Sequence, residues 1–87
     1  MEPYQLPRVA AYDYGAFRAL MDDHVQPTHA EFTEFMAQRF REESRRQSVV
    51  YVDVHPDEFA RYVGPTGQYD HGSLTRFIGE KFHGRRY

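Results

Sequence analysis

Imidazole and carboxylate groups lie close together in two stretches of this sequence, and such groups bind zinc and transfer protons. Asp53 and His55 end an apolar segment and point to one side of it, while Asp70 and His71 lie in the later loop YVGPTGQYDHGSL. A zinc site needs three or four such ligands from different segments, so these four residues form a candidate metal site. Their spacing matches no recognised metal motif. The structural alternative is that His55 caps a helix while Asp70 and His71 make hydrogen bonds in a turn.

The sequence carries no stronger motif for catalysis. It has no cysteine, which excludes thiolate nucleophiles, thiolate metal sites and disulfides. Neither a GxSxG serine nor a phosphate-binding glycine loop is present. Arg76 and His83 lie on one face of a predicted helix, where such a pair can hold a phosphate and move a proton. The first alternative function is therefore a metal- or His-dependent enzyme of the hydrolase or nuclease type, acting on phosphate-containing substrates through His55, Asp70 and His71. No cofactor is expected.

Arginine supplies ten of the eleven basic residues, and the charges are unevenly distributed. Residues 1–38 hold two basic and six acidic residues, a net charge of −4, whereas residues 39–87 hold nine basic and seven acidic residues, a net charge of +2. A nucleic-acid-binding regulator is the second alternative, using Arg39, Arg41, Arg45, Arg46, Arg85 and Arg86. The overall charge of −2, the interrupting glutamates and the absence of a known nucleic-acid motif count against it.

Aromatic side chains are abundant, with seven Phe and seven Tyr in 87 residues. They bury a large area, which suits the core of a short chain. Tyrosine and arginine are also enriched at the centres of protein interfaces. We therefore expect a non-enzymatic regulatory or protein–protein interaction module. The residues expected at its interface are Tyr51, Tyr62, Tyr69, Arg41, Arg45 and Arg46.

The elements that position these residues follow from hydrophobic periodicity and capping signals. Thr28-His-Ala-Glu31 fits a capping box, with Phe32, Phe35, Met36 and Phe40 as the buried stripe of the helix that follows. Beyond Phe40, ion pairs between Arg39 and Glu43 and between Glu42 and Arg46 are expected to support the helix end. The other predicted helices are 14–24 after Asp13, 56–63 beginning at Pro56 and stopped by Gly64-Pro65, and one from about Ser73 with Leu74, Phe77, Ile78 and Phe82 as its stripe. Only Gln68 to His71 remain without a structural assignment in the opening loop.

One segment, Ser48–Val54, reads clearly as a β-strand, since it is short and rich in β-branched residues. Its Val50, Val52 and Val54 face should meet the helices, and the opposite, mixed face is expected to be half exposed or covered by a partner. A lone strand leaves its N–H and C=O groups unpaired. It therefore pairs either with a short strand at residues 8–12 or with the same segment of a second copy, and we favour a homodimer. The predicted fold is a small α+β domain spanning residues 1–87, with about four helices on this principal strand and a flexible tail at 84–87.

The N-terminus has no basic and apolar signal-peptide pattern, and no apolar run approaches the length of a membrane span. We therefore expect a soluble, cytoplasmic protein that does not bind membranes.

Overall fold

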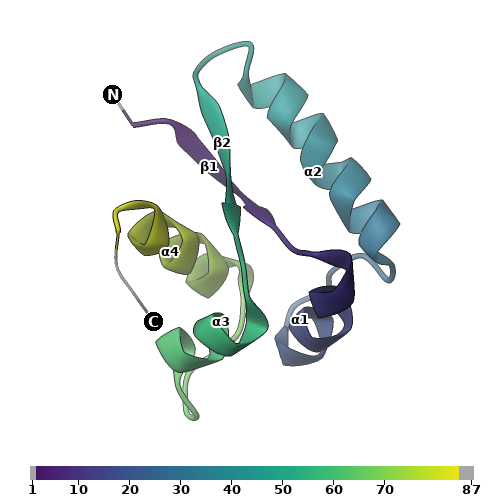
Figure 1. Cartoon of the computed structure of the whole chain (residues 1–87), viewed down its shortest axis with the longest axis vertical. Coiled ribbons are helices and arrows are strands. Elements are labelled where there is room, and N and C mark those ends of the chain that lie inside the picture. The colour runs from purple at the N-terminus through teal and green to yellow at the C-terminus, as the bar shows by residue number, and fades with distance from the viewer. Residues whose placement is uncertain (1, 85–87) are drawn as a thin grey trace.

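A pair of short parallel strands lies at the centre of the chain, with helices on both sides (Figure 1). The computed structural model describes residues 2–84, so Arg85 and Arg86 of the predicted basic clusters and most of the predicted tail lie outside it. The predicted small α+β fold is confirmed. Its elements in chain order are β1 (Tyr4–Arg8), a 3₁₀ turn (Ala11–Asp13), α1 (Tyr14–Leu20), α2 (His29–Glu43), β2 (Val49–Asp53), α3 (Pro56–Val63) and α4 (His71–Phe82).

Strand β2 finds its partner within the chain. It pairs with β1 in parallel, in a register that aligns Tyr4 with Val49 and Arg8 with Asp53. The partner strand was predicted at residues 8–12, which is wrong by four residues because the chain turns into a 3₁₀ helix at Ala11. Pro7 is tolerated in β1 because the backbone of every second residue points away from the neighbouring strand, so its missing N–H breaks no bond of the ladder.

Helices α2 and α4 cover opposite sides of the strand pair (Figure 1). On one side, the ring of Phe40 in α2 stacks on Tyr51 in β2 with centroids 4.9 Å apart. On the other side, α4 contacts both strands. The face of β2 that carries Tyr51 is therefore only partly covered by α2: Val49 and Tyr51 are half-buried and Asp53 is exposed, in line with the half-exposed face that was predicted.

Phenylalanines form the centre of the core. Phe17, Phe59 and Phe77 are fully buried, and their rings touch in series, at centroid distances of 6.4 Å from Phe17 to Phe59 and 5.4 Å from Phe59 to Phe77. The predicted burial is wrong for two residues of the helix stripes, since Phe35 is 44% exposed and Phe82 is 39% exposed. Phe35 lines a groove beside α2, and Phe82 is the last residue of α4.

Thr28 caps α2 as predicted, but the Glu31 carboxylate of the predicted capping box bonds to the Thr28 hydroxyl rather than to the Thr28 N–H. The Thr28 hydroxyl accepts from the Glu31 N–H at 3.2 Å and donates to the Glu31 carboxylate at 2.9 Å. Helix α3 begins at Pro56 and ends at Val63, where Gly64 stops it as predicted with a φ of 80° that favours glycine. Gly67 is needed for a different reason: a Cβ there would lie 2.5 Å from the Val63 carbonyl oxygen.

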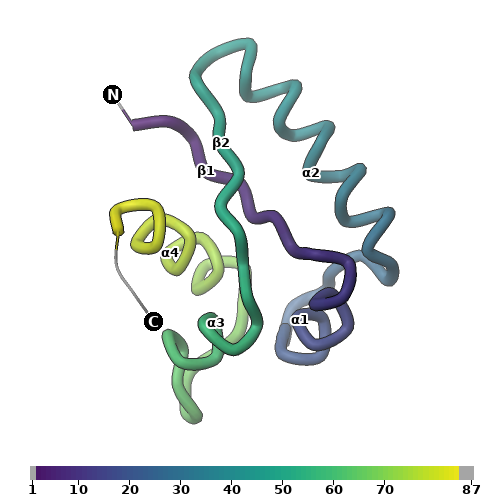
Figure 2. Tube along the Cα trace, in the orientation of Figure 1, coloured from purple at the N-terminus to yellow at the C-terminus, as the bar shows by residue number. Residues whose placement is uncertain are grey.

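Two helix boundaries differ from prediction. Helix α1 ends at Leu20 rather than near residue 24, and α4 begins at His71 rather than near Ser73. After α1, Asp22 and Asp23 bind the loop that precedes α4, whereas α4 begins at His71 because the Asp70 side chain caps it. Figure 2 shows that loop, residues 64–70, leaving α3 and returning to α4. No helix within residues 2–84 is long and apolar enough to span a bilayer.

Candidate functional site

The four residues of the candidate metal site have separate partners. Asp53 binds the Arg8 guanidinium at 2.7 Å, and His55 lies 3.7 Å from the Asp13 carboxylate. The Asp70 carboxylate accepts from the Ser73 N–H at 2.8 Å as the N-cap of α4, and His71 donates through Nε2 to the His24 carbonyl at 3.1 Å. Across residues 2–84, no three His, Asp or Glu side chains are placed to hold a metal ion.

The electrostatics of these carboxylates follows from the same hydrogen bonds. The hydrogen bond from Arg8, followed by its charge, lowers the pKa of Asp53 despite some cost from burial. The backbone N–H of Ser73 lowers the pKa of Asp70. Both groups are therefore held in the ionised state by structural partners, which accounts for their presence without a catalytic role.

The loop residues Gln68 to His71 connect α4 to the segment after α1. The Tyr69 N–H donates to the Asp22 carboxylate at 3.0 Å, and the His71 N–H donates to the Asp23 carboxylate at 2.9 Å. The Asp22 N–H in turn donates to the Tyr69 carbonyl at 2.8 Å. These three hydrogen bonds hold the loop against the segment that follows α1. The stretch from Gln68 to His71, which had no assignment from the sequence, therefore has a structural role.

The three tyrosines expected at an interface are partly buried against the core. Tyr69 packs edge-on against Phe59, and its hydroxyl donates to the Gly64 carbonyl at 3.2 Å. Tyr62 donates to the Glu80 carboxylate at 2.7 Å, and this bond is the main reason that the pKa of Tyr62 is raised. Tyr51 lies between Phe40 and the Arg8 guanidinium, which is 5.6 Å from its ring centroid.

The three arginines expected at an interface are exposed, but they do not share one surface feature. Arg41 points to the outer side of α2, where it lies 3.6 Å from Glu34. Arg45 and Arg46 lie in the turn between α2 and β2, and within the described chain neither has an ion-pair partner. The structure therefore separates Arg41 from the other two.

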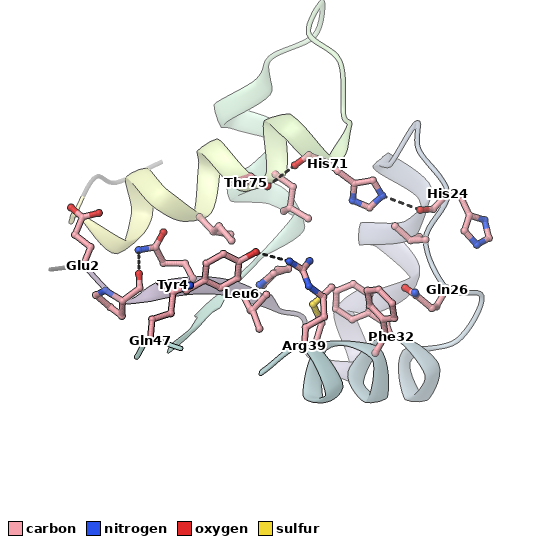
Figure 3. Close-up of a pocket in the computed structure, with 18 residues that line it drawn as sticks. Glu2, Tyr4, Leu6, His24, Gln26, Phe32, Arg39, Gln47, His71 and Thr75 are labelled. Atoms are coloured by element: carbon pink, nitrogen blue, oxygen red, sulfur yellow. Dashed lines mark hydrogen bonds between the residues drawn. The ribbon is translucent and has the colours of Figure 1, made fainter. Parts of the chain in front are cut away.

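A groove between α2 and α4 is a concave site with polar and charged groups in its lining (Figure 3). It has a volume of about 630 Å³ and runs over the outer edge of β1. Its walls are mixed, with polar and apolar surface in comparable amounts, and most of the apolar residues that form them belong to the core. The apolar lining comes from Leu6, Val25, Phe32, Phe35, Met36, Leu74 and Ile78.

Arg39 is the permanent positive charge in this groove. It projects from α2 toward β1 (Figure 3), where its guanidinium donates to the Tyr4 hydroxyl and lies 5.8 Å from the centre of the Tyr4 ring. The expected ion pair between Arg39 and Glu43 does not form, because Glu43 binds Gln47 at 3.0 Å instead. No carboxylate in the described part of the chain lies within ion-pair distance of Arg39. A guanidinium carries five N–H donors, so most of its bonding capacity remains available.

The ends and floor of the groove add further polar groups. His24 and His71 lie at one end, and Glu2 lies at the other, where it is 3.0 Å from His83. Along the floor, the backbone N–H and C=O of Gln5 point away from β2, because the alternate residues Tyr4, Leu6 and Arg8 pair with it. The groove is therefore lined by the Arg39 guanidinium, by the open backbone edge of β1 and by apolar side chains.

Sequence reasoning missed this groove. Its one available signal was the spacing of Phe35 and Arg39, which lie four residues apart and so share a helix face. The strand position of Tyr4 to Arg8 was also needed, and that depends on long-range pairing. No protein-family model, curated protein or solved structure gives a significant match to this chain.

Proposed function

We propose that the protein is a non-enzymatic interaction module that binds a segment of a partner protein in the groove between α2 and α4. The segment carries apolar side chains and at least one carboxylate. The observation that supports this most directly is Arg39, a guanidinium in the groove whose one hydrogen-bond partner within residues 2–84 is the Tyr4 hydroxyl. Arginine presents a planar fork that binds carboxylates in bidentate fashion.

Apolar burial supplies the other half of the recognition. Phe35 is 44% exposed and lines the groove beside Met36. A ligand that covers Phe35 removes apolar area from water, and each Å² of such area contributes about 25 cal/mol before the costs of association. A wholly polar ligand would leave this area exposed. The groove therefore favours a ligand that is apolar along its length and acidic at one position.

The backbone on the floor favours a peptide over a small acid. Gln5 offers one N–H and one C=O, and Pro7 offers one C=O, on the open edge of β1. An extended peptide can exchange hydrogen bonds with such an edge, as in other complexes formed by strand addition. The prolines leave Gln5 as the only N–H donor along Pro3 to Pro7 that faces outward, so side chains rather than a long ladder must determine specificity.

A displayed library of random dodecapeptides tests this proposal. Selection on the immobilised full chain is expected to enrich peptides that combine Asp or Glu with two or more large apolar residues. A synthetic, dye-labelled copy of an enriched peptide then gives the Kd by fluorescence anisotropy. We expect Arg39→Glu to weaken binding by about tenfold or more, since losing a partly desolvated charge partner costs about 2–5 kcal/mol.

Two further variants make the result specific to the groove. Phe35→Ser removes exposed apolar wall without touching the buried core, and is expected to weaken binding severalfold. Arg41→Glu makes the same charge reversal two residues from Arg39, on the outer side of α2, and is expected to leave the Kd within about twofold. A library that yields no peptide dependent on Arg39 and Phe35 contradicts the proposal.

A further inference from the structure

The outer edge of β2 carries unpaired backbone groups. The Tyr4 N–H donates to the Ser48 carbonyl and the Val54 N–H donates to the Arg8 carbonyl, each at 2.8 Å. In a parallel ladder this pattern directs the backbone of Val50, Val52 and Val54 toward β1. The N–H and C=O groups of Val49, Tyr51 and Asp53 therefore point outward. Of these six groups, only the Asp53 carbonyl has a partner in residues 2–84, the Lys81 ammonium at 2.7 Å.

The two edges of the sheet differ in a way that matters for association. Edge strands that stay free are commonly protected by proline or by covering elements. Strand β1 has Pro3 and Pro7 on its open edge, whereas β2 has no proline between Val49 and Asp53. Helices α2 and α4 both contact β1 more extensively than β2. The less protected edge is therefore that of β2, where Lys81 covers the Asp53 carbonyl alone, and it lies on the far side of the sheet from the groove.

We propose that a second copy of this chain occupies the β2 edge. The two β2 strands pair antiparallel across a two-fold axis at Tyr51, which joins the two strand pairs into one continuous sheet of four strands. Tyr51 then exchanges both backbone hydrogen bonds with Tyr51 of the second copy, and Val49 pairs with Asp53 of the second copy. Such a self-complementary contact is the usual form of a two-fold interface.

Charges at the two ends of β2 favour a second copy over an unrelated strand. Arg45 and Arg46 lie just before β2, and Asp57 lies just after it in the first turn of α3. In an antiparallel arrangement centred on Tyr51, the basic turn that precedes one β2 lies near the acidic first turn of α3 that follows the other β2, and the contact occurs twice. Asp57 can take part alongside its ion pair with Arg61 at 3.5 Å, since its side chain is 74% exposed. A generic strand has no reason to be basic before and acidic after the paired segment.

Sedimentation velocity of the full chain at increasing concentration, at low and at moderate salt, measures the self-association. We expect a monomer–dimer equilibrium that weakens as salt screens the end charges. The double change Arg45→Glu with Arg46→Glu is expected to weaken the dimer about tenfold or more. Adding Asp57→Arg to that variant restores opposite charges and is expected to recover most of the affinity. Arg18→Glu on α1 is the matched charge control and should leave the dimer unchanged.

Amide hydrogen exchange measured by NMR identifies the edge. Exchange at Val50, Val52 and Val54 should be slow at all concentrations, because these N–H groups face β1. Exchange at Val49, Tyr51 and Asp53 should be fast in the monomer and slow in the dimer. A chain that stays monomeric at several hundred micromolar in low salt overturns the proposal, and so does a dimer in which these three amides remain fast. Pairing with another protein's strand in place of self-association also counts against it.

Discussion

The pair formed by Arg8 and Asp53 links the ends of β1 and β2, and it illustrates what single residues do in this chain. The carboxylate pKa is lowered mainly by the hydrogen bond from Arg8. A lowered pKa means that the pair stabilises the fold above the unfolded pKa of about 3.9. That contribution is lost as the pH falls through the folded pKa. Both side chains are more than half exposed, so the loss is about 1 kcal/mol or less.

Arg8→Gln tests this link directly. We expect the pKa of Asp53 to rise toward its ordinary value, because the first cause of the shift is removed. A pH titration of the carboxylate followed by NMR measures the change, and Arg18→Gln serves as the control that leaves Asp53 unaffected. An unchanged pKa of Asp53 in Arg8→Gln would show that the ion pair does not form in solution.

The residue types alone indicated which segments carry charges and aromatic rings. They did not indicate which of these side chains would contact each other in the fold. The sequence favoured Arg39 with Glu43 because the two are one helical turn apart. The structure instead pairs Arg39 with Tyr4, 35 positions earlier in the chain. Long-range partners of this kind depend on how the elements pack, so the groove could not be predicted from helix periodicity. The hydrogen bonds from the loop before α4 to Asp22 and Asp23 were missed for the same reason.

At the scale of elements, helix α2 depends on its N-terminal cap. The Thr28 side chain satisfies the Glu31 N–H, one of the backbone donors that a helix start leaves unpaired. Thr28→Ala removes this acceptor and is expected to lower the free energy of unfolding by about 1 kcal/mol. Urea denaturation followed by circular dichroism measures it. Thr33→Ala, one turn into the same helix, is the comparison that retains the cap, and a larger loss there would contradict the role of Thr28.

Elements with strong local signals were predicted well, and those fixed by tertiary contacts were not. The Thr28 cap correctly marked the start of α2. Pro56 and Gly64 correctly marked the start and the end of α3, because each of these residues acts on its own backbone. The strand at Tyr4 to Arg8 was misplaced, since two prolines obscure its pattern and only its pairing with β2 identifies it. Its pairing partner in β2 lies 45 positions later in the chain, so no pattern in the neighbouring sequence indicates the pairing.

For the whole molecule, stability rests on one aromatic core, because the chain has no cysteine with which to form a disulfide. Phe59 lies at its centre, fully buried, and contacts Phe17, Tyr69 and Phe77. Phe59→Ala is expected to cost about 3–5 kcal/mol, a large share of the roughly 5–15 kcal/mol available to a domain. Thermal unfolding should show a large fall in Tm or no cooperative transition. Phe82→Ala, which truncates a partly exposed ring, should lower Tm far less, and equal losses would contradict this placement of the core.

The same small molecule thus presents two separate surfaces, a groove over the β1 edge and an open β2 edge. In the proposed dimer, the two grooves lie on the β1 edges away from the β2 contact, so the proposal implies that one dimer binds two partner segments. Two linked sites raise the avidity for a partner that displays the segment more than once.

The affinity of one selected peptide for the variants Arg39→Glu and Arg41→Glu tests the proposed function most directly. The two changes make the same charge reversal on one helix and differ only in the face that carries it. We predict that Arg39→Glu weakens binding by about tenfold or more, whereas Arg41→Glu leaves the Kd within about twofold. Equal losses in the two variants, or a greater loss for Arg41→Glu, would show that the groove between α2 and α4 is not the binding site.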